Sequence, residues 1–239
     1  MPPVLTTLPM AEPHQRRSGG CLSKLMFLLL FAAAGGLGTA VYQVCQAQDL
    51  TDIGGHAPPA KPLPEREMKV VLKNAIDRGY AVTLSEAEIN QWLGRTLTTR
   101  QGGLLEEKAT LDRVWVRLED GRAEVIMARN LAGHPFTVSM YLQVERLEGP
   151  KGAVTEIALH GGPYHPDLPN PPRGGRFGKL VVPQGFLLLV MPAYEKLAAL
   201  FPEEIELGFR EMARIRIEKG QLVLDPREPL GHEGMPATF

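Results

Sequence analysis

The longest apolar run in the chain is LMFLLLFAAAGGLGTAVYQV, which covers residues 25–44 without a charged side chain. A helix of this length measures about 30 Å, which matches the hydrocarbon core of a bilayer. A buried helix of a soluble domain is the alternative, but such a helix is rarely apolar on every face. The run therefore predicts a transmembrane helix that anchors the chain in a membrane.

Basic residues flank this run on one side only. Arg16, Arg17 and Lys24 precede it, and the next basic residue is Lys61. Because basic flanks stay in the cytoplasm, residues 1–24 are predicted to be a cytoplasmic tail. The expected location is single-pass in the inner (cytoplasmic) membrane, with the C-terminal part periplasmic or extracellular.

A cleaved signal peptide is the alternative interpretation of the same run. Cys45 and Ala47 would then occupy the small-residue positions of a cleavage site before Gln48. The long lead and the long apolar core favour an uncleaved anchor. Both interpretations export the remainder of the chain.

Small residues recur along the apolar run at a spacing of four. Ala32, Gly36 and Ala40 would lie on one helix face, where two membrane helices can approach closely. Cys45 follows just outside the predicted span, and the exported part contains no other cysteine. The small residues either only fill the apolar span or allow a homodimer through Ala32, Gly36, Ala40 and Cys45.

The pattern changes after the span, first to a proline-rich stretch and then to a folded domain. Residues 45–64 include GGHAPPAKPLP, which predicts a semi-extended linker. Residues 65–239 are enough for one domain with one core. We therefore expect four parts, which are residues 1–24, 25–44, 45–64 and 65–239.

Two amphipathic helices are predicted at the start of this domain. PEREMKVVLKNAIDRG ends in Gly79, a typical C-terminal cap. TLSEAEINQWLGRTL carries a capping box formed by Ser85 and Glu88, and Trp92 belongs to its apolar stripe.

Alternating apolar and polar residues then predict strands. VWVRLEDGRAEVIMA turns at Asp120-Gly121, which sets Arg117 opposite Glu124. RIRIEKGQLVLDP turns at Lys219-Gly220. In FTVSMYLQVE, residues 137, 139, 141 and 143 are predicted to face outward. Together these patterns predict an α+β domain, with a curved antiparallel sheet of about six strands packed with a few helices.

The segment VPQGFLLLVMPAYEKLAALF interrupts the strand pattern with more apolar residues than one helix stripe needs. Pro192 breaks it, so it predicts a buried, kinked helix lying across the sheet. The segment is either ordinary core, covered by the sheet and the two opening helices, or it lines a groove for an apolar, lipid-like ligand together with the curved sheet. We expect Phe186, Leu189, Tyr194 and Trp92 to contact that ligand.

The net charge and the residues that could carry out chemistry limit the classes of function that the sequence supports. A net charge of −1 argues against binding nucleic acid. HGGPYHPDLPNPPRGGRFGK, residues 160–179, is interpreted as a long loop, although His160, His165 and Asp167 are residue types that bind zinc. No catalytic residues and no cofactor are predicted.

The combination of one N-terminal span, TLSEAEINQWL, hairpins and GKLVVP before an apolar helix resembles the YpmS-like family. These are membrane-anchored extracytoplasmic bacterial proteins without agreed catalytic residues. The likeness covers about residues 83–200, and the N-terminal tail and proline-rich residues 163–172 depart from it. The resemblance implies the location and the fold class, not an activity.

The sequence thus favours a non-catalytic, membrane-anchored binding or accessory module of the cell envelope. Its partner is expected to be a lipid or an envelope protein. Two alternatives stay open. One is a metal-dependent envelope enzyme that uses His160, His165 and Asp167, and the other is a scaffold that only binds partners.

Overall fold

The computed structural model describes residues 20–54, 66–100, 109–131, 133–149, 152–164, 167 and 171–227. The chain forms two compact units, Met1–Val41 and Tyr42–Phe239. The second unit contains every strand among the described residues.

Helix α1 (Gly20–Cys45) coincides with the predicted apolar run. Within it, Leu22–Cys45 is long and apolar enough to cross a membrane, the one helix of this kind in the part of the chain that the structure describes. Its 24 residues extend about 36 Å at the helical rise. The predicted N-terminal apolar helix is confirmed, and its insertion and orientation stay predictions.

The larger of two antiparallel sheets has six strands in the order β2-β3-β4-β6-β7, with β5 also paired to β4. They are β2 (Ala109–Glu119), β3 (Arg122–Leu131), β4 (His134–Gly149), β5 (Gly152–Leu159), β6 (Arg173–Phe177) and β7 (Leu180–Pro183). Strand β4 is 16 residues long. It pairs with β6 over its first half and with β5 over its second half.

The smaller sheet has the order β1-β9-β8 and joins distant parts of the chain. Its strands are β1 (Val82–Ser85), β8 (Arg214–Glu218) and β9 (Gln221–Asp225). It is tied to the β2–β3 turn, because Gly121 N donates to Ile217 O over 2.9 Å and Gly220 N donates to Leu118 O over 3.0 Å.

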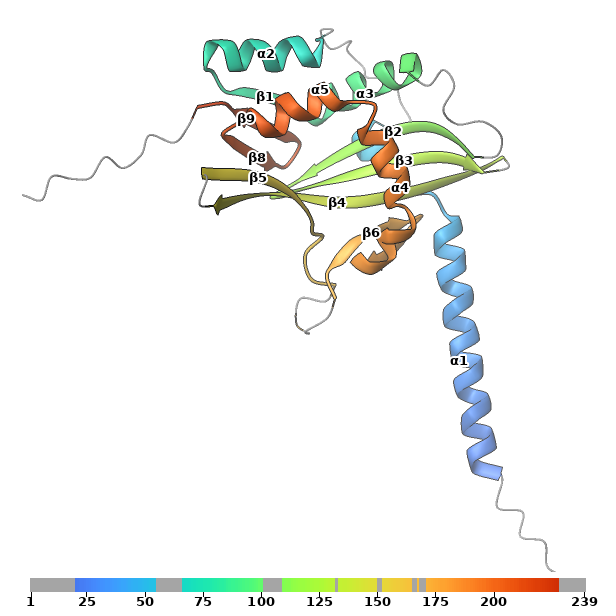
Figure 1. Ribbon diagram of the computed structural model, residues 1–239. Coiled ribbons are helices and arrows are strands. Elements are labelled where there is room, and N and C mark those ends of the chain that lie inside the picture. The colour runs from blue at the N-terminus through green and yellow to red at the C-terminus, as the bar shows by residue number, and fades with distance from the viewer. Residues whose placement is uncertain are drawn as a thin grey trace, which may run out of the picture. The chain divides into compact units, whose positions relative to one another are not determined.

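Short helices complete the domain. They are η1 (Thr51–Ile53), α2 (Met68–Arg78), α3 (Glu86–Arg100), η2 (Gln184–Leu189), α4 (Met191–Ala198), α5 (Pro202–Ile205) and η3 (Glu206–Arg210). In Figure 1, α2, α5 and the smaller sheet lie over the same face of the larger sheet. The α+β class and an antiparallel sheet of six strands packed with a few helices are confirmed.

The predicted register of the first hairpin and the predicted turn of the second are confirmed. Arg117 pairs with Glu124 across the Asp120-Gly121 turn. Ile217 pairs with Leu222 across the second turn. Gly121 and Gly220 both adopt positive φ, at 76° and 75°, which explains why glycine follows the first turn residue in each case.

Residues 184–200 differ from the prediction of one buried, kinked helix. The segment divides into η2 and α4 at Val190. In η2 only Leu187 is buried, whereas Phe186, Leu188 and Leu189 are exposed. Three-residue turns and proline at the start of α4 prevent one continuous apolar face from forming.

The predicted loop at residues 160–179 also contains regular structure. Residues 173–177 form β6, which pairs with β4 from Val138 to Met140. Gly175 permits this pairing, because a Cβ there would overlap the Ser139 backbone. A Cβ at Gly174 would likewise overlap the Gln184 backbone, so both consecutive glycines serve close packing around β6.

The outward face of β4 is covered, which the alternation did not predict. Thr137, Ser139 and Tyr141 are all buried. Gln48 N donates to Thr137 Oγ1 over 2.9 Å, and Gln48 Nε2 donates to Ser139 Oγ over 3.2 Å. The first part of the predicted linker, residues 46–54, therefore belongs to the folded domain. Residues 55–65 lie outside the described residues.

Candidate functional site

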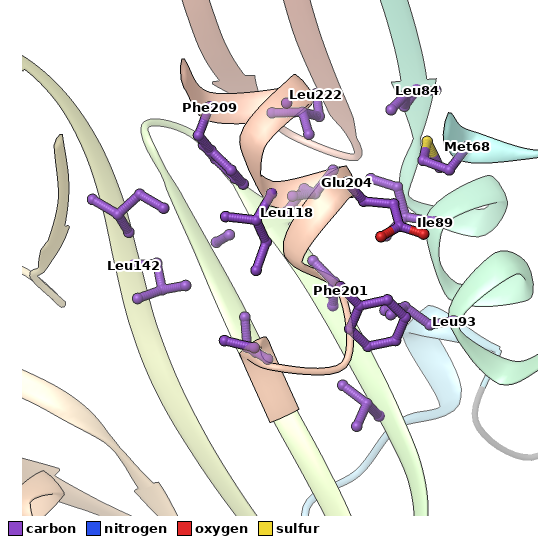
Figure 2. Close-up of a pocket in the computed structure, with 18 of the residues that line it drawn as sticks. Met68, Leu84, Ile89, Leu93, Leu118, Leu142, Phe201, Glu204, Phe209 and Leu222 are labelled. Atoms are coloured by element: carbon purple, nitrogen blue, oxygen red, sulfur yellow. The ribbon is translucent and has the colours of Figure 1, made fainter. Parts of the chain in front are cut away.

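A cavity of about 340 Å³ lies between the larger sheet, the smaller sheet and the helices of the domain (Figure 2). It is lined by Met68, Leu72, Leu84, Ile89, Trp92, Leu93, Val114, Val116, Leu118, Ala123, Val125, Met140, Leu142, Val144, Ile157, Tyr194, Leu197, Ala198, Phe201, Glu204, Ile205, Gly208, Phe209, Ile217, Leu222 and Leu224. Among these lining residues, Glu204 is the only one with a charged side chain. The cavity can therefore hold an apolar molecule and offers almost no polar recognition.

The floor of the cavity is the inner face of β2, β3 and β4. Side chains alternate between the two faces of a strand, so Val116 and Leu118 face the cavity while Arg117 between them faces away. Met140 and Leu142 repeat this spacing on β4. The two-residue period of the sequence thus produces an apolar floor on one side of the sheet.

Helix α3 forms one wall and is fixed to the edge strand β2. Asn90 donates through Nδ2 to Val116 O over 2.8 Å and accepts from Val116 N through Oδ1 over 2.6 Å. Glu86 Oε2 accepts from Leu118 N over 2.7 Å. These side chains satisfy backbone groups that an edge strand would otherwise expose. They hold the apolar stripe of α3 over the floor.

Burial and hydrogen bonding shift the pKa of Glu86 in opposite directions. Burial raises the pKa of its carboxyl group, and the hydrogen bond from Leu118 N lowers it by less. The pKa of Glu86 is therefore above its ordinary value. The carboxylate accepts a hydrogen bond from the backbone of β2 and is not part of the cavity lining.

Tyr194 of α4 contributes its ring to the cavity, while its hydroxyl is occupied by backbone. The hydroxyl lies 3.0 Å from both Val125 O and Val138 O, and it donates to one of these carbonyls at a time. Burial raises the pKa of Tyr194, so the phenol stays neutral. The residue holds α4 on the sheet rather than acting as an acid or a base.

The short π-helical segment η3 lies beside the cavity and widens it at Gly208. A Cβ at Gly208 would meet only Leu72 Cδ1, at 3.9 Å, which is an ordinary contact distance. The backbone there is not in the left-handed region. The empty space beside Gly208 is therefore a consequence of the missing side chain. π-Helical turns are rare and often occur at functional sites.

The structure brings two of the four predicted ligand-binding residues to the cavity. Trp92 and Tyr194 line it, and Trp92 packs on Phe201 with ring centroids 5.2 Å apart. Phe186 and Leu189 lie on η2, where their side chains are 53% and 75% exposed, and neither lines the cavity. Contact of these four residues with a ligand stays a prediction.

Most of the lining was not identified as a site from the sequence. The four predicted contact residues include none on a strand, since alternation shows which residues share a face but not whether that face is filled. In Figure 2, Phe209 and Leu142 lie on one side of the opening, and Met68 and Leu93 lie on the other. These residues come from four separate elements, so no local pattern marks them as a group.

The described residues contain no group of three His, Cys, Asp or Glu side chains that could hold a metal ion. His160 is exposed, and its Nδ1 accepts from Gly162 N over 3.2 Å. Asp167 is exposed as well. His165 lies outside the described residues, so a site that includes it stays a prediction.

A polar cluster covers the opposite face of the larger sheet. Glu124 is fully buried, accepts from Ser139 Oγ over 2.6 Å and pairs with Arg117 Nη1 over 2.7 Å. Arg117 also pairs with Asp52 over 2.8 Å and donates to Asp49 O over 3.0 Å. The cluster therefore attaches the segment that follows α1 to the sheet.

Arg117 stays positively charged in this cluster. Burial lowers the pKa of its guanidinium, but the hydrogen bond to Asp52 and the charge of Glu124 outweigh burial and raise the pKa. The arginine stays protonated at every ordinary pH. This arrangement is structural, because its charges pair with one another and not with the cavity.

No family model matches this chain, and no curated protein matches it. The resemblance to the YpmS-like family therefore stays a prediction.

Proposed function

We propose that this protein is a membrane-anchored, non-catalytic module that binds an apolar, lipid-like ligand in the cavity of its extracytoplasmic domain. The observation that carries the proposal is the cavity of about 340 Å³ with a lining that is apolar except for Glu204. This volume lies at the lower end of the range for small-molecule sites. It suits one acyl chain or a ligand of similar size.

The second support is that the cavity is a half-open hollow lined by core side chains. Apolar surface that other side chains do not cover lacks the close contacts of a packed interior. Sheet, helices and the smaller sheet all border the space. A bound apolar ligand would supply the missing contacts, which gives the domain a reason to retain the cavity.

The anchor follows from helix α1, whose residues Leu22–Cys45 are long and apolar enough to cross a membrane. With Arg16, Arg17 and Lys24 before the span and no lysine or arginine after it until Lys61, the domain would lie outside the cytoplasm. The ligand of such a protein would be a component of the envelope. The metal-dependent enzyme and the scaffold remain alternatives, and no contact among the described residues favours either one.

Native mass spectrometry of the purified full-length protein tests the proposal. We expect a mass increment from a bound lipid-like molecule, which solvent extraction then identifies. Gly208→Leu should reduce the occupied fraction, because the new side chain fills the space beside Leu72. Ala87→Leu is the matched control, since Ala87 is exposed on α3 and outside the lining.

Stability should move in the opposite direction from binding. In ligand-free protein, Gly208→Leu should raise the free energy of unfolding by about 1 kcal/mol, because a leucine side chain becomes buried and a flexible glycine is removed. Ala87→Leu should change it little. A wild-type protein with no bound molecule after purification and after incubation with fatty acids or phospholipids would refute the proposed function.

A further inference from the structure

Exposed apolar side chains of the second unit concentrate on the short helix η2. Phe186, Leu188 and Leu189 are 53%, 77% and 75% exposed, and Leu187 between them is buried and attaches η2 to the core. Elsewhere among the described residues after α1, exposed large apolar side chains occur singly, at Val70, Tyr80 and Ile157. Contiguous exposed apolar residues mark interaction surfaces in soluble domains.

The chain segment that leads into η2 packs against the end of the apolar span. Lys179 N, in the β6–β7 turn, donates to Gln43 O over 2.9 Å. Gly178 lies so close to this segment that a Cβ would be 2.6 Å from Gln43 O and would overlap Val44 O. All of these residues belong to the second unit. The β6–β7 turn is thus held where the chain leaves the predicted span.

The distance from this turn to η2 is short. Strand β7, Leu180–Pro183, separates the two and has four residues, which extend about 13 Å at the strand rise. Even a fully extended chain would place Phe186 no more than about 25 Å from Lys179. The exposed residues of η2 therefore lie near the point where the span ends.

The geometry points to the lipid surface of the anchoring membrane as the partner that covers Phe186, Leu188 and Leu189. This inference rests on the membrane anchor proposed above, and it deepens that proposal by naming the source of the ligand. Helix η2 continues directly into α4, which lines the cavity through Tyr194 and Leu197. An η2 inserted at the acyl boundary would connect the membrane with the wall of the binding site.

A lipid surface is a better partner for the exposed side chains of η2 than a second copy of the chain is. A covalent anchor raises the effective concentration of the domain at the membrane, so docking of η2 costs little additional entropy. Lys179, exposed next to the exit of the span, can face anionic headgroups while the apolar residues enter the interface.

Fluorescence of the full-length protein in liposomes of phosphatidylcholine and phosphatidylglycerol tests the inference. In a background of Cys21→Ser and Cys45→Ser, an NBD fluorophore is attached at Leu188→Cys, and doxyl-labelled lipids serve as quenchers. Val70→Cys is the matched control, because Val70 is 55% exposed on α2 and stands alone there as an exposed large apolar side chain. We expect blue-shifted emission and strong quenching at residue 188, with neither at residue 70.

Each other outcome overturns the inference. Equal, weak quenching at residues 188 and 70 would place η2 in water. A blue shift at residue 188 without quenching by doxyl lipids would place it against protein, as in a dimer. Protein that does not float with the liposomes would refute the anchor and this inference with it.

A second measurement separates docking from ligand binding. Replacing Leu188 and Leu189 with serine should slow uptake of a fluorescent fatty acid from vesicles by at least about tenfold, since two apolar side chains are removed from the interface. Equilibrium binding of the same fatty acid added from detergent solution should not change, because neither residue lines the cavity. Loss of binding from detergent in the wild type would refute the proposed function, whereas unchanged uptake in the variant would refute only docking.

Discussion

At the scale of single residues, Gln48 covers the second face of β4, where it donates to Thr137 and Ser139. Thr137, Ser139 and Tyr141 were expected to face outward, and the structure buries them. The covering residue Gln48 is 89 positions from Thr137 in the chain. An alternating pattern is local, so it carries no information about a segment that packs from so far away.

Glu124 should be the most sensitive charge in the domain. It is fully buried, and its partners Arg117 and Ser139 approach within 2.7 Å and 2.6 Å. Glu124→Gln leaves Arg117 without its buried counter-charge and should lower the free energy of unfolding by about 3 kcal/mol. Urea unfolding followed by tryptophan fluorescence measures the change. The exposed Glu145→Gln serves as control, and equal stability of both variants would show that the cluster is not structural.

At the scale of elements, local signals predicted the hairpins and the helix caps. The Ser85–Glu88 capping box is confirmed, because Glu88 N donates to Ser85 Oγ over 3.2 Å and Ser85 N donates to Glu88 Oε2 over 2.9 Å. The exposure of η2 was not predicted, because apolar residues such as Phe186 and Leu189 are typical of a core helix. Composition alone does not distinguish an apolar residue that faces the core from one that faces a membrane.

The capping box predicts a dependence of stability on pH. Burial raises the pKa of Glu88, but hydrogen bonds from Ser85 and the charge of Arg66 outweigh it, so the folded-state pKa lies below the ordinary value. The stabilisation by ionised Glu88 is therefore complete above the ordinary pKa of about 4.3. It is lost as the pH falls through the lower folded-state pKa.

The matching variant is Glu88→Gln, which keeps the side-chain shape but cannot ionise. At pH 7 it should be less stable than wild type by about 1 kcal/mol, since charged hydrogen bonds are stronger than neutral ones. The difference between the two proteins should shrink below pH 4. A difference that stays constant between pH 7 and pH 3 in chemical denaturation would contradict the assigned role of the carboxylate.

The small residues of helix α1 and Cys45 lead to the prediction of a parallel dimer. Cys45 is exposed at its C-terminal end, and no side chain lies near a Cβ built on Gly36. If Ala32, Gly36 and Ala40 form the contact face, two copies of Cys45 come together outside the bilayer. Non-reducing gels should show a disulfide-linked dimer that disappears in Cys45→Ser and weakens in Gly36→Leu. A wild-type monomer with freely alkylated Cys45 would contradict the dimer.

At the scale of the whole molecule, the α+β class and the six-stranded antiparallel sheet followed from the sequence, whereas the cavity did not. Its lining combines strands of both sheets with α2, α3, α4, α5 and η3. A groove was expected from apolar excess at residues 182–201, yet half of the predicted contacts, Phe186 and Leu189, lie elsewhere. Unfilled space depends on how side chains of distant elements pack, and hydrophobic periodicity does not report it.

The central claim is that the cavity holds an apolar ligand in the anchored protein. Photo-crosslinking in membranes with a diazirine-bearing fatty acid tests it most directly, because mapped peptides identify the residues that touch the acyl chain. We predict cross-links to the lining, at Met140, Leu142 and Phe209, that decrease in Gly208→Leu and persist in Ala87→Leu. Cross-links confined to residues 22–45, with no difference between the two variants, would contradict the claim.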